Sequence, residues 1–416
     1  MWRRAARARA AAPAVVLPLA WREGAFCLRY TLTDTQGNGT AAPPAAFWGV
    51  ADTGSPFLLV GRCLRSDCPQ YCAQWGCFGQ QGQPSGLADT VEVYVSGESA
   101  MQWRKGVGIS FPDSTAGGTS PVVDNIIFGV QGAVSGSGGT GAGVFFGLVR
   151  DRAADIRPSF LEQTAFRALD FDLRQPGRET LAFGTEERLA GPGARWVPLV
   201  DPRVWGAPIR FYAAIADKVL VGDGQPLLMG EGDAPGRPRR VLCIFDTGTT
   251  GVSMSPGLHD AYWPAVLQAA QARRGASGAF TRSRRLTALL PGADGGEVPI
   301  DMFVGKHPTY GSGLDLVTEV SEVAWAGIGD PASLASYRGA PGDGAGASRG
   351  AVGGPVARGD LPFDDIAFLG LGFFVGRRWA IDVAGGNVSF TARESATGDA
   401  QAPGSDSAGV PASRFG

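Results

Sequence analysis

Two aspartates, Asp52 and Asp246, stand in the same short motif, once in each half of the chain. Each opens an Asp-Thr-Gly triplet that follows an apolar run and precedes a hydroxyl residue, Ser55 in the first copy and Thr249 in the second. Two matched copies predict a duplicated unit that brings two carboxylates together. Because two carboxylates in contact do not both ionise readily, the pair would hold one proton. One oxygen can then act as a base towards water while the other acts as an acid towards a carbonyl.

Other catalytic residue types are scarce. The 416 residues include only two histidines, His259 and His307. A Ser/His or Cys/His hydrolase needs one correctly placed His, and a zinc hydrolase usually needs two or three. We expect both histidines to be solvated surface side chains without a catalytic role. The predicted chemistry therefore uses carboxylates, with no metal and no cofactor.

Four of the six cysteines form a cluster, and two interpretations of it compete. Zinc sites favour Cys-x2-Cys spacing, whereas the gaps here are longer, so a pair of local disulfides in a loop fits better. Disulfides would indicate an oxidising compartment, and their connectivity is not readable from spacing. The clustered residues are Cys63, Cys68, Cys72 and Cys77. Cys27 and Cys243 lie in apolar runs and are expected to be buried free thiols.

The elements that must position these residues are mainly strands. Short β-branched or aromatic runs bounded by Gly, Pro, Asn or Asp recur along the chain, for example at 26–32 and 126–130. Helical signals are few and fall at 158–163, with a capping box from Ser159 to Glu162, and at 264–274. Many short strands and sparse helices predict a mostly β protein.

The two halves also repeat downstream of the triplets. Residues 143–148 and 366–372 each contain two bulky apolar residues followed by Gly. Such a segment is typical of a buried strand whose Gly lets another backbone pass close by. Each half is therefore expected to have one strand that ends in the Asp loop and one apolar strand packed beneath it.

With these features the chain resembles the pepsin-like aspartic peptidases. Residues 180–184 followed by 196–199 resemble the segment that closes the first lobe of that family, and residues 366–390 resemble its C-terminal signature. The resemblance implies a mostly β, bilobal fold with two pseudo-symmetric lobes and a cleft between them. The N-terminal lobe would span 14–195 and the C-terminal lobe 196–392, with 1–13 and 393–416 disordered.

The resemblance implies roles for the residues around each aspartate. Gly54 and Gly248 would permit the tight loop and let backbone N–H groups approach the carboxylates. Ser55 and Thr249 would donate to the outer carboxylate oxygens, the alternative being ordinary capping of a turn. Tyr94 matches the flap tyrosine that closes over substrate, or else it pairs across strands.

Several positions depart from the family pattern. Val95 stands where the family usually has Gly, Leu59 where many members have a Trp, and Ala51 where a larger apolar residue is usual. The cysteine cluster resembles the insertion of nepenthesin-like, plant-type members, without matching its spacing.

The function indicated is that of an aspartic endopeptidase, a monomer that cleaves an extended peptide or protein substrate by activated water. The alternatives are a catalytically silent relative that binds a protein or inhibitor, and a zinc-binding interaction protein built on the cysteine cluster. A net charge of −2 argues against nucleic acid as a partner.

Targeting is open. No run of 18 apolar residues predicts a membrane span, and the Arg- and Ala-rich start is read either as a transit peptide or as part of a signal peptide. The cysteine cluster favours the secretory pathway, vacuolar or extracellular, with the plastid as the alternative.

Overall fold

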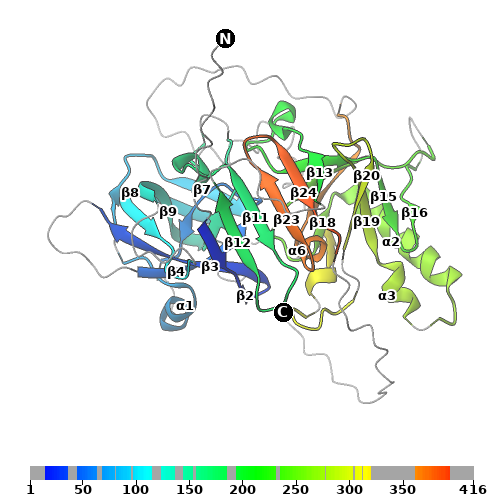
Figure 1. Cartoon of the computed structure of the whole chain (residues 1–416), viewed down its shortest axis with the longest axis horizontal. Helices are drawn as coiled ribbons and strands as arrows, with labels where there is room; N and C mark the ends of the chain where they lie inside the picture. Colours follow the sequence, from blue (N-terminus) through cyan, green and yellow to red (C-terminus); the bar gives the residue numbers. More distant parts are fainter. Residues whose placement is uncertain are drawn as a thin grey trace, which may run out of the picture.

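The strands predicted from the sequence dominate the structure. The computed structural model describes residues 15–35, 45–62, 68–79, 81–94, 97–114, 123–135, 144–152, 156–184, 194–230, 235–276, 278–302, 305–311, 313–319 and 361–393. Within these ranges the protein is mostly β, with four sheets and few helices (Figure 1). The mostly β expectation is therefore confirmed.

The largest sheet is built from the first part of the chain. Its strands follow the order β10-β4-β3-β8-β9-β5, with β2 paired to β3 and both β6 and β7 paired to β8. The long strands β8 and β9 pair over most of their length, and register shifts interrupt this pairing. The nine strands are β2 (Ala20–Arg22), β3 (Ala25–Asp34), β4 (Ala45–Asp52), β5 (Leu59–Val60), β6 (Gln83–Pro84), β7 (Thr90–Tyr94), β8 (Gly97–Ser110), β9 (Val123–Ser135) and β10 (Phe145–Gly147).

Two smaller sheets come from the second half. The five-stranded sheet has the order β14-β17-β22-β18-β21 and contains β14 (Ala213–Ala216), β17 (Val241–Phe245), β18 (Val252–Met254), β21 (Val317–Glu319) and β22 (Asp365–Leu369). The four-stranded sheet has the order β16-β15-β19-β20 and contains β15 (Lys218–Val221), β16 (Gln225–Pro226), β19 (Leu286–Pro291) and β20 (Glu297–Asp301).

A six-stranded sheet joins the two halves, and its order is symmetric. It runs β1-β12-β11-β23-β24-β13, so each half contributes one early strand at the edge and two late strands towards the middle. In Figure 1 the green strands β11 and β12 lie beside the orange strands β23 and β24 in the middle of the molecule. The strands are β1 (Val15–Pro18), β11 (Ala168–Asp172), β12 (Thr180–Gly184), β13 (Arg195–Pro198), β23 (Arg378–Asp382) and β24 (Asn387–Phe390). This order supports the duplication inferred from the triplets.

The helices are short except for one. They are α1 (Cys68–Trp75), α2 (Pro256–Ala272), α3 (Ala279–Ser283) and α6 (Leu371–Phe374), with 3-10 turns η1 (Leu161–Gln163), η2 (Pro202–Trp205) and η3 (Gly313–Asp315). The capping box at η1 is formed: the Ser159 N–H donates to Glu162 Oε2 at 3.0 Å, and the Glu162 N–H donates to Ser159 Oγ at 3.1 Å.

Helix α2 begins earlier than the sequence predicts. We expected a start at Pro264, but that residue lies inside the helix, which begins at Pro256. Leu258, Tyr262 and Val266 are buried one turn apart along one face. Burial of this face outweighs the hydrogen bond that the proline removes.

The histidine expectation is wrong for His307, which is 8% exposed. Its ring stacks on Tyr310 with centroids 4.6 Å apart, and its Nδ1 accepts from the N–H groups of Thr309 and Tyr310 at 3.2 and 3.3 Å. His259 is partly exposed, and its Nε2 accepts from Trp263 Nε1 at 3.0 Å. Both rings therefore have local structural partners.

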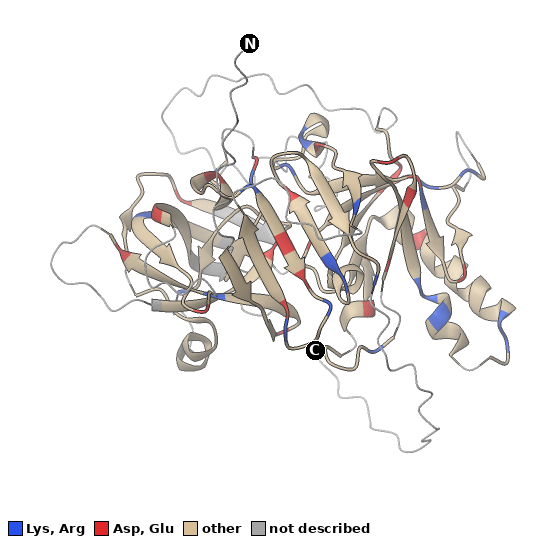
Figure 2. Cartoon of the chain, viewed as in Figure 1, with Lys and Arg blue, Asp and Glu red and all other residues tan. Residues whose placement is uncertain are grey.

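Charged residues are interspersed along the described ribbon and no single-sign stripe dominates it (Figure 2). Among the residues described, no helix has both the length and the apolar character to cross a membrane.

Candidate active site

The two aspartates occupy matching positions in the sheets. Asp52 ends β4, which pairs in parallel with β10, so that Asp52 lies opposite Gly147. Asp246 follows β17, which pairs in parallel with β22, and its N–H donates to Leu369 O at 3.0 Å. The two apolar segments predicted to pack with the Asp strands therefore do so, each as the next parallel strand.

The glycines that end those segments permit close backbone approach. A Cβ on Gly147 would lie 2.4 Å from the Phe57 nitrogen, and one on Gly370 would lie 2.1 Å from Thr249 O. Real Cβ atoms do not make such contacts. The prediction that these glycines let another backbone pass is confirmed.

The middle threonines of the triplets lock the two loops together. The Thr53 N–H donates to Thr247 Oγ1 at 3.1 Å, and the Thr247 N–H donates to Thr53 Oγ1 at 3.0 Å. Each hydroxyl also donates across the interface, Thr53 to Phe245 O at 2.8 Å and Thr247 to Ala51 O at 2.5 Å. Both threonines are fully buried. No role for these threonines was predicted from the sequence, although their presence in both copies of the triplet is a signal for one.

The lock brings the carboxylates face to face. A Cβ on Gly54 would lie 2.5 Å from Asp246 Cγ, and one on Gly248 would lie 2.5 Å from Asp52 Oδ1. Each loop glycine therefore packs against the carboxylate of the other loop. Any side chain there would displace one carboxylate, so both positions require Gly.

Backbone donors serve both carboxylates alike, whereas hydroxyl donors do not. The Gly54 N–H donates to Asp52 Oδ1 and the Gly248 N–H donates to Asp246 Oδ1, each at 2.8 Å. The Thr249 hydroxyl donates to Asp246 Oδ2 at 2.8 Å, as expected. The Ser55 hydroxyl is buried near Asp52 and favours the ionised form of that carboxyl, but it makes no hydrogen bond with the geometry of the Thr249 bond.

The environment of Asp52 favours its protonated form. Burial, and next the charge of Asp246, raise the pKa of Asp52 well above its ordinary value of 3.8. The Ser55 hydroxyl and the Gly54 N–H act against this rise without cancelling it. Asp52 is 6% exposed, whereas Asp246 is half-buried and has one more hydrogen-bond donor. The two carboxyls therefore differ in burial and in hydroxyl donors, and the surroundings of Asp52 raise its pKa.

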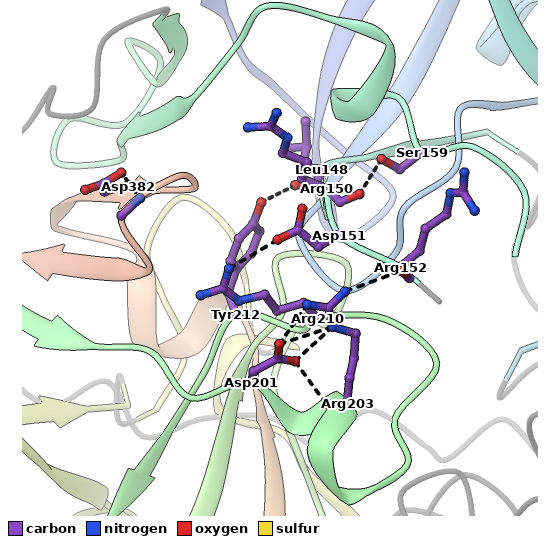
Figure 3. A network of polar contacts seen from close by, with 11 residues as sticks. Leu148, Arg150, Asp151, Arg152, Ser159, Asp201, Arg203, Arg210, Tyr212 and Asp382 are labelled. Carbon is purple, nitrogen blue, oxygen red and sulfur yellow. Dashed lines mark hydrogen bonds and ion pairs between the residues drawn. The ribbon is translucent and has the colours of Figure 1, made fainter. Parts of the chain in front are cut away.

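A second path of hydrogen bonds connects the Asp strands behind the loops. The Leu148 N–H donates to Asp52 O at 2.7 Å, and Leu148 O accepts from the Tyr212 hydroxyl at 2.7 Å. Tyr212 O in turn accepts from the Phe245 N–H at 2.8 Å, directly before Asp246. Figure 3 shows Tyr212 reaching Leu148 at the junction of the two halves.

Ion pairs surround this junction. Arg210 Nη1 lies 3.1 Å from Asp151 Oδ2, and the Arg210 N–H donates to Asp151 O at 2.7 Å (Figure 3). Arg203 pairs with Asp201 and also donates to Arg152 O at 3.3 Å. These contacts join segments from both halves, so the relative position of the two Asp strands is held by more than the threonines.

The cysteine cluster is described in part. Cys72 and Cys77 form a disulfide, which excludes zinc binding by those two residues. Cys68 begins α1, so the segment expected to be a loop contains a helix, whose Trp75 is buried. Cys63 lies outside the described residues, and its oxidation state and that of Cys68 remain predictions. Cys27 and Cys243 are buried free thiols, as predicted.

The Tyr94 prediction stays open. Tyr94 ends β7 and pairs with Gly97 at the start of β8, so the two strands form a hairpin. The side chain of Tyr94 and the tip residues Val95 and Ser96 lie outside the described residues.

Two departures from the family pattern prove to be packing residues. Leu59 is buried and lies opposite Gly129 on β9, where a Cβ would be 2.6 Å from its Cδ2. Ala51 is fully buried beside Phe146, and its carbonyl accepts from Thr247. Neither residue blocks the carboxylates.

Comparison with known proteins gives no family assignment, since no protein-family model matches the chain and no curated protein matches its sequence. Across the part of the chain that the structure describes, no three His, Cys, Asp or Glu side chains are grouped as a metal centre requires.

Proposed function

We propose that the protein is an aspartic endopeptidase with a pepsin-like, two-lobed fold, acting on an extended peptide or protein substrate. One observation carries the proposal: the two carboxylates of a duplicated loop face each other, and the glycine of each loop packs against the carboxylate of the other. The symmetric order of the six-stranded sheet and the matching parallel strands beside Asp52 and Asp246 support two related lobes.

In the proposed reaction, the ionised Asp246 accepts a proton from water as the water oxygen bonds to the scissile carbonyl carbon. Asp52 gives its proton to the carbonyl oxygen, which forms a tetrahedral diol. In the second step Asp246 returns its proton to the amide nitrogen as the C–N bond breaks, and a diol hydroxyl gives its proton to Asp52. Both carboxyls thereby recover their starting states, and no covalent enzyme intermediate forms.

The order of proton transfer follows from the surroundings of each carboxyl. Burial and the neighbouring charge raise the pKa of Asp52, which suits the acid of the first step. The N–H of Gly248 and the hydroxyl of Thr249 stabilise a negative charge on Asp246, which suits the base. Because the pair must hold one proton, we expect activity at acidic pH and its loss on either side.

The test is cleavage of a denatured protein across acidic pH, with and without pepstatin, by wild type, Asp52→Asn and Asp246→Asn. We expect pepstatin-sensitive cleavage that falls by at least about a hundredfold in each variant, since an amide cannot exchange the proton. Asp124→Asn, at an exposed position on β9, is the matched control and should retain wild-type turnover. Substantial turnover in Asp246→Asn would disprove the shared-proton mechanism.

Tyr94 is proposed as a lid residue on the β7–β8 hairpin, and Tyr94→Phe should reduce turnover about tenfold, less than either Asn variant. A catalytically silent binding protein is the remaining alternative. It predicts pepstatin binding without cleavage by wild type at any pH. Neither Ala51 nor Leu59 favours it, because both are accommodated by packing.

A further inference from the structure

Helix α6 is a buried element pressed against the second Asp loop. Its Leu371 and Gly372 N–H groups donate to Thr249 O and Thr250 O at 2.9 and 3.0 Å, and the Gly370 N–H donates to Gly251 O at 2.8 Å. A Cβ on Gly370 would lie 2.1 Å from Thr249 O. The helix and the loop are therefore in direct contact with no free space between them, so a shift of α6 must move Thr249.

At the far end of α6, one side chain donates to the carbonyls of Gly372 and Phe373, while the carbonyls of Leu371 and Phe374 accept from backbone N–H groups. The last carbonyls of a helix lack partners within it, and in a buried helix they need other donors. Arg393 Nη2 donates to Gly372 O at 3.0 Å and to Phe373 O at 3.4 Å, and also to Asp301 O at 2.7 Å. One guanidinium nitrogen thus ties α6 to the end of β20.

The electrostatics show that Arg393 is held there at a cost. Arg285, Arg377 and Arg393 surround Asp301, whose two oxygens pair with Arg285 at 3.1 Å and Arg377 at 2.8 Å. Burial, and next the charge of Arg377, lower the pKa of Arg393 to about 10. A cation in such surroundings is retained where its donors are needed, and these donors meet buried carbonyls.

We propose that Arg393 is a positioning residue for the carboxylate pair, acting through α6 on Thr249. The path consists of four hydrogen bonds. The Arg393 guanidinium donates to Gly372 O, the α6 N–H groups donate to Thr249 O and Thr250 O, and the Thr249 hydroxyl donates to Asp246 Oδ2. This inference rests on the proposed function of the pair, since it assigns Arg393 to holding the outer donor of Asp246. Arg393 does not touch the carboxylates.

The test variant is Arg393→Met, with Arg285→Met as the matched control because Arg285 pairs with Asp301 but contacts no α6 carbonyl in the described structure. We expect kcat/KM to fall about tenfold in Arg393→Met and to change less than about twofold in Arg285→Met. Arg393→Lys should recover to within about threefold, since a single nitrogen makes all three contacts and an ammonium has three donors. If Arg393→Met does not fold, Arg393→Lys is compared with the Arg285→Met control. A tenfold loss of kcat/KM in Arg393→Lys, with hydrogen–deuterium exchange of the α6 amides unchanged, overturns the proposal.

A double-mutant cycle with Thr249→Val separates positioning from general stability. If Arg393 acts through Thr249, then adding Arg393→Met to Thr249→Val should lower kcat/KM less than about threefold further. The acid limb of the pH profile of kcat/KM reports the titration of the carboxyl pair. It should shift in the same direction in Arg393→Met and in Thr249→Val. Fully additive losses, or an unshifted acid limb in Arg393→Met, overturn the proposal.

A readout that needs no activity distinguishes this inference from the proposed function. Hydrogen–deuterium exchange of the Leu371 and Gly372 amides should quicken at least about tenfold in Arg393→Met and stay unchanged in Arg285→Met. If wild type cleaves nothing but this exchange pattern holds, the proposed function fails while the coupling of Arg393 to the loop stands. Unchanged exchange in Arg393→Met overturns the coupling, whatever the activity.

Discussion

The buried threonine lock gives the most quantitative prediction, and Thr247→Val is the perturbation. Valine keeps the shape and burial of Thr247 but removes its hydroxyl. That hydroxyl accepts from the Thr53 N–H and donates to Ala51 O. Leaving a buried polar group without a partner costs about 1–3 kcal/mol, so two such groups predict a loss of about 2–6 kcal/mol in the free energy of unfolding. Partial relaxation of the surroundings places our expectation in the lower half of this range, at about 3 kcal/mol.

The assay is urea unfolding followed by tryptophan fluorescence, for which the chain supplies 10 reporters. Thr247→Ser is the control, because it keeps the hydroxyl and loses only a methyl group, at about 1 kcal/mol. The lock is symmetric, so Thr53→Val should cost the same as Thr247→Val to within about 1 kcal/mol, and the double variant should cost less than their sum. A Thr247→Val protein as stable as Thr247→Ser would refute the reasoning.

Three further predictions concern the pair, its glycine and the disulfide. The pKa of Asp52 is raised above 3.8 in the folded protein. Its contribution to the free energy of unfolding is therefore complete below pH 3.8 and is lost as the pH rises through the folded pKa. Asp52→Asn should therefore match wild type in urea at pH 3 and gain up to about 1.4 kcal/mol per pH unit above pH 4; a constant difference would contradict this. Gly54→Ala puts a Cβ 2.5 Å from the opposing carboxyl carbon and should lower kcat/KM about a hundredfold, whereas Gly230→Ala, in open space, should have no effect. Replacing both Cys72 and Cys77 by Ser opens a loop of sequence separation 5 and should cost about 2 kcal/mol in urea; alkylation of either thiol in unreduced native protein would contradict the disulfide.

Local sequence pattern correctly predicted the features of the fold that depend on interactions between residues close in the chain. The many short β-branched and aromatic runs predicted a mostly β fold. The apolar-apolar-Gly segments predicted the strands that pack beside Asp52 and Asp246. The burial of Cys27 and Cys243 and the Ser159–Glu162 capping box also follow from neighbouring residues. The strand character, the thiol burial and the capping box depend on residues a few positions apart, which is the distance over which periodicity and turn chemistry act, whereas the pairing beside the aspartates was predicted from the repeat in the two halves.

Sequence pattern gave wrong predictions where packing against residues distant in the chain decides the local structure. Helix α2 runs through Pro264 because Leu258 and Tyr262 bury against the sheet, and His307 is interior because it stacks on Tyr310. Propensity carries no information about such packing, since the same local sequence is stable in either state until a partner surface is supplied.

The sequence by itself determined the two Asp-Thr-Gly loops and hence which residues could share a proton. Only the tertiary structure decided how the two carboxyls differ. Asp52 is more deeply buried than Asp246, and Thr249 makes a hydroxyl bond that Ser55 does not. The lock between Thr53 and Thr247 likewise joins residues 194 positions apart. Charge stabilisation depends on solvent exclusion, so two copies of the same motif acquire different surroundings only when the chain has folded around them.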